Sequence, residues 1–392
     1  APVLSARSVM TLFHRPDVSP LIFSYKNIST ALDRFKPISG SLAFERMAVS
    51  SPVSGASFGR VSFSADIEQL RLHSKRLPGP LRVDEGKFSW RKNRFTLKEV
   101  DASLGNSTIA RLSAVFDLGK SPSFEVHSQS AELVADEVYP WLLSFKNFEP
   151  FLKDFSVTKG MVYLPDLKLN GPLHLPAQWR YALTCSLKNL VLTSDAFGDP
   201  VTVNNGSFDL TSDTMPEVAR NRVWMNATDL TWGKNHLALI GGMILSKNET
   251  LLDLTLTADA IDWNQIKNIV DYAEKKSKIP DSRFSKRDLL GTLKVQADNF
   301  NYETYSVHPL TADLSFKPDG VAITVNEAVV CSISFQGQLK INEQTLEIFL
   351  VPTAVNQMLA PAVACFTDQK NLAMGTFNLN GQLLSKSKPD EF

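Results

Sequence analysis

Apolar and polar residues alternate along most of this chain with a period of two. The alternation runs in short segments bounded by Gly, Asn and Pro, and it restarts at the roughly 10–14-residue spacing of an antiparallel meander. A period of two places successive side chains on opposite faces of a strand. The pattern therefore predicts a mainly β protein in which each strand has one apolar and one polar face.

The apolar positions keep one parity within each predicted strand, while the positions between them carry Thr, Lys, Gln, Asp, Glu and Asn. The residues that we expect on the apolar face are Val61, Phe63, Leu183, Leu187, Leu293, Val295, Leu314, Phe316, Val321, Ile323, Val325, Ile333, Phe335, Leu339, Ile341, Leu346, Ile348 and Leu350.

One stretch of the sequence occurs twice. Arg60–Phe88 returns 120 positions later as Arg180–Phe208, and eight of the 29 positions are identical. In the first copy the alternation slips by one residue between Ile67 and Leu70, and the second copy slips at the corresponding place. A one-residue slip turns every later side chain to the other face unless a bulge absorbs it. The repeat therefore predicts the same bend in both copies.

Two helices interrupt the strands at corresponding places. One helix is predicted at residues 136–153 and begins at the candidate N-cap Asp136. The other is predicted at residues 262–279, where Asp262 and Gln265 form a predicted capping box. A third, short helix is predicted over Thr30–Phe35.

The strands restart after Gly40, Gly160 and Gly291. We therefore divide the chain into an N-terminal segment with a short helix (1–39), two repeat units that each end in a helix (40–155 and 156–280), and a divergent third unit (281–392).

Composition narrows the function classes. The chain has 392 residues, 43% hydrophobic and 21% charged, and its 41 basic and 41 acidic residues give a net charge of zero. Nucleic acid is not an expected partner, because phosphate binding requires clustered Lys and Arg. No run approaches the roughly 18–20 apolar residues of a membrane-spanning helix. Without an initiator Met or a signal peptide, the sequence is expected to be part of a longer protein.

Candidate chemistry is sparse. The six histidines lack metal-ligand spacing, and no nucleophile elbow, Walker A loop or dinucleotide fingerprint occurs. Acidic pairs such as Asp84 and Glu85 are expected in turns and on the surface. We therefore predict no catalytic residues, no metal and no cofactor. An enzyme that processes carbohydrate would need a carboxylate pair in a cleft, and this is the weakest alternative.

The three cysteines also lack metal-ligand spacing. Cys185 falls on the apolar side of a predicted strand and is expected to be a buried thiol. Cys331 and Cys365 can form a disulfide in an oxidising compartment, or they can remain two buried thiols.

Several stretches resemble the bacterial AsmA-like family near its C-terminal region. They are Leu133–Leu142, the segment Gly160–Trp179, Val330–Leu339, Ala364-Cys365 and Gly375–Gly381. These motifs combine Gly, Pro and alternating apolar residues, and they carry no catalytic group. The resemblance covers most of residues 30–384.

This resemblance implies a protein of the Gram-negative envelope, anchored in the inner membrane by a helix outside this sequence, with its bulk in the periplasm. It implies a bridge-like lipid transfer protein, in which a long, curled, taco-shaped antiparallel β-sheet carries phospholipid acyl chains between the inner and outer membranes, alongside other envelope proteins. The apolar face would line this groove, and the two longer helices would cap its edges.

About 20–25 strands at ~4.8 Å each would make a groove on the order of 100 Å long. The alternative is a structural or adhesion module of tandem β-sandwiches, with closed cores and no ligand, and alternation alone does not separate the two.

Overall fold

The computed structural model describes residues 3–5, 36–50, 60–74, 77, 79–143, 152–175, 178–215, 218–246, 249–277, 288–342, 344–367 and 374–387. The chain divides into two compact units. Unit 1 comprises Ala1–Lys153, Val157–Leu190 and Asp209–Ala219, and unit 2 comprises Asp154–Ser156, Val191–Phe208 and Arg220–Phe392.

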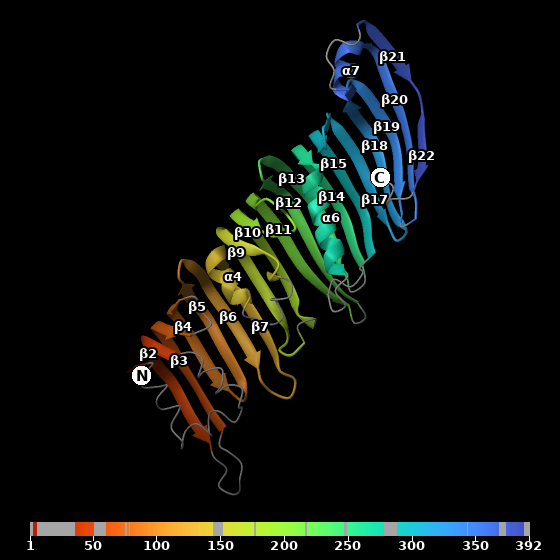
Figure 1. Ribbon diagram of the computed structural model, residues 1–392. Coiled ribbons are helices and arrows are strands. Elements are labelled where there is room, and N and C mark those ends of the chain that lie inside the picture. Colours follow the sequence, from red (N-terminus) through yellow and green to blue (C-terminus); the bar gives the residue numbers. More distant parts are fainter. Residues whose placement is uncertain are drawn as a thin grey trace. The chain divides into compact units, whose positions relative to one another are not determined.

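Unit 1 is built on an antiparallel sheet (Figure 1). Its strands are β1 (Val3–Ser5), β2 (Lys36–Ser50), β3 (Arg60–His73), β4 (Leu81–Arg91), β5 (Arg94–Leu104), β6 (Ser107–Asp117), β7 (Ser123–Ser128), β8 (Ser130–Val134), β9 (Ser156–Pro172) and most of β10 (Arg180–Thr193). Each strand from β2 to β6 pairs with the next, and β9 pairs with both β7 and β8.

Unit 2 has the same kind of architecture. Its strands are parts of β11 (Val201–Met215) and β12 (Val218–Trp232), then β13 (Asn235–Leu245), β14 (Glu249–Asp262), β15 (Asp288–Tyr302), β16 (Tyr305–Val307), β17 (Leu310–Lys317), β18 (Gly320–Val330), β19 (Ile333–Ile341), β20 (Leu346–Met358), β21 (Thr376–Asn380) and β22 (Leu383–Ser387). The described helices are α4 (Ala135–Leu143) in unit 1, and α6 (Trp263–Ser277) and α7 (Leu359–Thr367) in unit 2.

The predicted fold class is confirmed: the protein is mainly β, with curled sheet and a few short helices. The sheet is not wholly antiparallel, however, because β14 and β15 run parallel from Glu249 opposite Asp288 to Asp262 opposite Asn301. Parallel neighbours require a crossover connection, and α6 lies within it. The expectation of an antiparallel sheet is therefore wrong at this one described pair.

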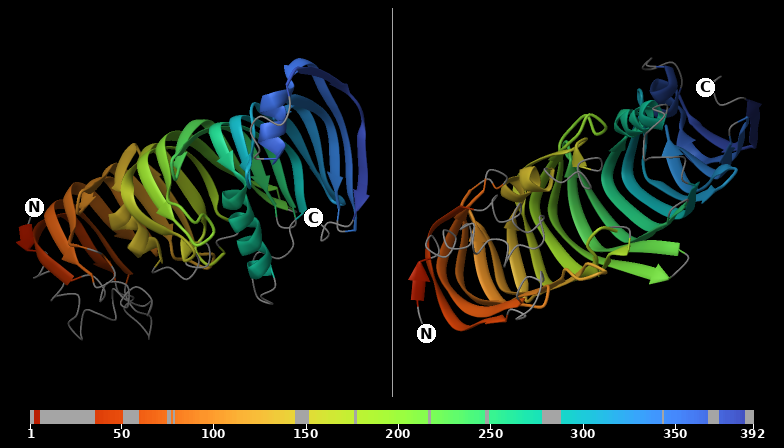
Figure 2. Two further views of the ribbon diagram at one scale, coloured as in Figure 1. Left: turned by 45° about the horizontal axis from the view of Figure 1, so that its top comes forward. Right: turned by 90° about the horizontal axis from the view of Figure 1, so that it is seen from below.

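The predicted bend is present in both copies of the repeat. Gln69 and Asn189, which occupy equivalent positions at the slip, have positive φ angles of 48° and 50°. Each lies opposite a glycine with positive φ, Gly40 or Gly160, and a Cβ on either glycine would lie 2.5 Å from the Cα atom of Leu70 or Leu190. Figure 2 shows the resulting curvature of the strands within each unit.

The helices predicted at residues 136–153 and 262–279 correspond to α4 and α6, and both begin close to their predicted starts. The N–H of Asn264 donates to Asp262 Oδ1 at 2.8 Å, so Asp262 caps α6 as predicted. The capping-box role of Gln265 is wrong, because its amide instead contacts Asp199 and Asn235.

Other helix predictions fare differently. α4 ends at Leu143, whereas the prediction ran to residue 153; residues 144–151 and the helix expected at Thr30–Phe35 lie outside the described residues. The sequence did not predict α7. Among the described helices, none combines the length and apolar character that a membrane crossing requires.

The repeat extends beyond the 29 positions found in the sequence. From Arg94 onward, residues of unit 1 match residues 128 positions later, so that Gly105 corresponds to Gly233. Both α4 and α6 then start at equivalent positions, Ala135 and Trp263. The two units therefore contain equivalent sheet-and-helix modules.

Candidate functional site

One apolar row crosses the strands of unit 2. The register places Leu293 of β15 opposite Leu314 of β17, and the row continues through β18, β19 and β20. Its members are Leu254, Leu293, Leu314, Ile323, Leu339 and Ile348. Sequence-predicted residues from five strands thus become cross-strand neighbours on one face.

Two further rows flank this one on the same face. One contains Leu256, Val295, Ala312, Val325, Gly337 and Leu350. The other contains Gly291, Phe316, Val321, Ile341 and Leu346. Beyond a register shift in β18, Phe335 faces Ala328 and Ile333 faces Val330.

Most of this face is only partly buried. Val295 is 8% exposed, whereas Ile341 is 37% exposed and the other predicted residues of these rows have intermediate exposure. Within the described strands, the face is therefore an apolar surface that water still reaches in part.

The apolar face of unit 1 carries a row of aromatic rings. Its phenylalanine members lie on strands β2 to β7 and Trp179 directly precedes β10, and the ring centroids of successive members are 5.0–6.4 Å apart. The members are Phe44, Phe63, Phe88, Phe95, Phe116, Phe124 and Trp179. Of these residues only Phe63 is predicted from the alternation, because the register that aligns the others depends on bulges in β4 and β5.

The remaining predicted residues lie on strands of unit 1. Leu183 and Leu187 alternate with exposed or half-buried positions of β10, on the same side as buried Cys185. Val61 belongs to β3 and is paired with Val49, but its side chain is not among those described.

The opposite face of unit 1 is charged. Lys87 Nζ lies 3.2 Å from Glu45 and from Asp66, and hydrogen bonds to these carboxylates raise the pKa of Lys87. Arg111 pairs with Glu99 at 3.3 Å. Such exposed pairs add little stability. They show that this face is exposed to solvent and that the other face is the apolar one.

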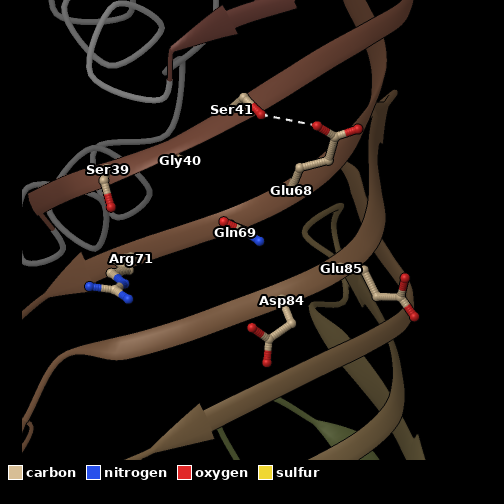
Figure 3. A pocket seen from close by; sticks show the side chains of 8 residues that line it. All are labelled: Ser39, Gly40, Ser41, Glu68, Gln69, Arg71, Asp84 and Glu85. Atoms are coloured by element: carbon tan, nitrogen blue, oxygen red, sulfur yellow. Dashed lines mark hydrogen bonds between the residues drawn. The ribbon is translucent and has the colours of Figure 1, made fainter.

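A polar pocket of about 640 Å³ lies over β2, β3 and β4 (Figure 3). Its lining includes Glu68, Arg71, Asp84 and Glu85, and the hydroxyl of Ser41 donates to Glu68 at 3.3 Å. Within the described ranges, no three His, Cys, Asp or Glu side chains form a group that could hold a metal ion. The pocket lies where the strands bend at Gly40 and Gln69.

A second, apolar pocket of about 250 Å³ lies between the sheet of unit 1 and α4. Its lining residues are Leu77, Leu81, Ala102, Ser103, Leu104, Ser107, Thr108, Ile109, Leu133, Val138 and Trp141. The alternation of single strands does not predict this pocket, because its walls come from β4, β5, β6, β8 and α4.

Glu137 fixes α4 to the turn between β5 and β6. Its carboxylate accepts hydrogen bonds from the backbone N–H groups of Asn106 and Ser107 at 3.0 and 3.1 Å, and from both of their side chains. Partial burial alone would raise the pKa of Glu137, but these hydrogen bonds outweigh it, and the pKa is lowered. The ionised carboxylate therefore holds the helix over the pocket.

Cys331 and Cys365 form a disulfide, which ties the turn between β18 and β19 to α7. Cys185 is a buried free thiol, and its burial, together with the charge of Asp209, raises its pKa to about 11. A thiol in this state is unreactive at neutral pH.

No protein-family model matches the chain, and neither a curated protein nor a solved structure matches it.

Proposed function

We propose that this chain is a non-enzymatic, lipid-binding segment of an AsmA-like, bridge-like lipid transfer protein of the periplasm. Its apolar sheet faces carry phospholipid acyl chains between the inner and outer membranes, and an anchor outside this sequence holds the protein in the inner membrane. The observation that supports this most directly is the apolar rows of unit 2, which are partly exposed and lie side by side across as many as six strands.

The physical basis is the transfer of hydrocarbon out of water. Each methylene removed from water contributes about 0.8 kcal/mol, while a charged headgroup is more stable in solvent. The row from Leu254 to Ile348 crosses strands spaced about 4.8 Å apart, so it extends on the order of 20–25 Å. Its side chains are aliphatic and offer no fixed polar anchor, which favours sliding over retention at one position.

Two further observations support the proposal. The disulfide between Cys331 and Cys365 fits an oxidising compartment such as the periplasm. The described strands of each unit belong to a single curled sheet, whereas the adhesion-module alternative requires two sheets packed face to face in each sandwich.

The proposal is tested by native mass spectrometry, with lipid extraction, of the chain purified from a Gram-negative host. We expect co-purifying phospholipid that an apolar competitor displaces. The substitution Ile323→Asp places a charge between Leu314 and Leu339, and it should abolish the bound-lipid signal and block transfer between vesicles.

Ala322→Asp is the matched control. Ala322 is the preceding residue on the polar face, where it lies opposite Ser315 and Lys340, so an added carboxylate is tolerated there. Both variants should keep the β-sheet circular dichroism signal. Equal lipid content in the two variants, or a lipid-free wild-type chain, would contradict the proposal.

A further inference from the structure

The pocket beneath α4 in unit 1 has an equivalent position in unit 2. Glu137 and Gln265 are the third residues of α4 and α6, and each contacts the equivalent strand residue, Ser107 or Asn235. The two helices are therefore attached to their sheets at the same point, and the space beneath them can be compared residue by residue.

Several lining positions differ in size between the modules. Unit 2 is larger at three of them, where Phe197 replaces Leu77, Leu230 replaces Ala102 and Trp232 replaces Leu104, and smaller at a fourth, where Ile269 replaces Trp141. The backbone at the first position is the same, since the N–H of Leu77 donates to Ser74 O at 3.2 Å and that of Phe197 donates to the equivalent serine at 3.0 Å. The difference therefore lies in the side chains.

In unit 2 the larger aromatic side chains pack against each other. The rings of Phe197 and Trp232 lie 6.4 Å apart in an edge-to-face arrangement, and Trp232 Nε1 donates to Phe197 O at 3.1 Å. Four other equivalents of the pocket lining, Leu230, Leu237, Ile261 and Ile266, belong with Trp232 to one packed cluster. Where unit 2 has packed aromatic rings, unit 1 has a pocket of about 250 Å³.

The chemistry of the pocket suits a hydrocarbon. Its most buried polar side chain, Ser107, is already engaged, because its hydroxyl donates to Glu137 at 3.0 Å and accepts the N–H of Val134 at 2.9 Å. An aliphatic cavity of about 150 Å³ is enough to bind benzene. The pocket in unit 1 is larger, and it offers an alkyl chain close contact with Leu104, Val138 and other apolar residues.

We infer that this pocket binds the methyl end of a lipid acyl chain. The inference rests on the proposed function, to which it adds a fixed binding position in unit 1. Leu81, Ala102 and Ile109 belong both to the pocket lining and to the apolar cluster of the unit 1 face. A chain lying on that face can therefore enter the pocket without crossing a polar surface, while its headgroup stays in water.

The test uses a hexadecanoic acid that carries a photoreactive diazirine near its methyl end. After irradiation of the full chain with this probe, peptides are mapped by mass spectrometry. We expect adducts on the strand and helix segments around Leu104 and Val138, and unlabelled hexadecanoic acid should suppress them. The double variant Leu77→Phe/Leu104→Trp places the two equivalent unit 2 residues in unit 1. It should lose these adducts while keeping adducts elsewhere on the apolar faces.

Each outcome separates the two proposals. Adducts on the apolar faces but not around the pocket would overturn this inference and leave the proposed function standing. No adduct anywhere on the chain would count against both. Pocket adducts that persist in a folded double variant would also overturn the inference. If the double variant does not fold, Leu104→Phe alone provides a smaller filling substitution, and the wild-type map remains decisive.

Discussion

The helix–sheet junctions of the two units have equivalent backbone positions, but the side chains between helix and sheet differ. In unit 1, α4 is held by the carboxylate of Glu137 above an apolar pocket. In unit 2, α6 is held by the amide of Gln265, and the rings of Phe197 and Trp232 pack edge to face at the positions equivalent to Leu77 and Leu104. A repeated module can therefore keep its frame while one copy packs two aromatic rings at the place where the other has an apolar pocket.

The anchoring residues differ for an electrostatic reason. Gln265 Nε2 donates to Asp199 Oδ2 at 3.2 Å, and the residue equivalent to Asp199 in unit 1 is Gly79. A carboxylate is therefore favourable at Glu137, where the neighbouring groups are donors, and unfavourable in unit 2, where an acid is already present.

The largest effect is expected from emptying the junction of unit 2. Trp232→Ala removes the ring against Phe197 and its hydrogen bond, and it should cost about 3 kcal/mol of unfolding free energy. Leu104→Ala at the equivalent position should cost about 1–2 kcal/mol, because that side chain already borders a cavity. Urea unfolding measures both, and hydrogen exchange of 249–277 should report loosening only in the Trp232 variant. Equal costs would contradict the difference in packing.

An intermediate effect is expected from exchanging the anchors. Glu137→Gln weakens the charge-assisted hydrogen bonds from Asn106 and Ser107, and it should cost about 1–2 kcal/mol at neutral pH. Gln265→Glu should also destabilise, because it places a second carboxylate beside Asp199. A stabilising Gln265→Glu substitution would show that Asp199 does not distinguish the two junctions.

The Glu137 variant also has a pH signature. The pKa of Glu137 is lowered in the folded chain, so the ionised form is the one that stabilises the fold. The wild type should have a larger unfolding free energy than Glu137→Gln, and this difference should be complete above the ordinary carboxyl pKa of about 4.3. The difference should disappear as the pH falls through the lower, folded-state pKa. Unfolding both proteins in urea across this acid range measures the difference, and an advantage independent of pH would be inconsistent with an ionised anchor.

The smallest expected effect is a gain. Leu104→Trp introduces the unit 2 residue into the pocket of unit 1, and filling a cavity in this way commonly adds about 0.5–2 kcal/mol. A higher melting temperature, with a reduced yield of diazirine adduct, would link the cavity to ligand binding. A strongly destabilised variant would mean that the two junctions differ in shape as well as in filling.

Period-two patterning was sufficient to predict the β class, the one-sided apolar rows and the bends at Gln69 and Asn189, because all of these depend on local parity. The parallel pairing of β14 with β15 depends on the path of the crossover connection, and the alternation of residues within a strand does not indicate that path. The pocket was missed for a similar reason. Leu104 and Trp232 become equivalent only at an offset of 128, whereas the repeat found in the sequence has an offset of 120 and ends before them.

The parallel pairing also has a consequence for the order in which unit 2 assembles. Each residue of β14, from Glu249 onward, pairs with a partner 39 positions later, so no contact between these strands closes a shorter loop. In unit 1, β8 and β9 can instead begin at Val134 and Met161, on either side of α4, and zip outward. Since non-local pairing slows folding, the joining of β15 to β14 is expected to be a late folding step of unit 2, after α6 has formed.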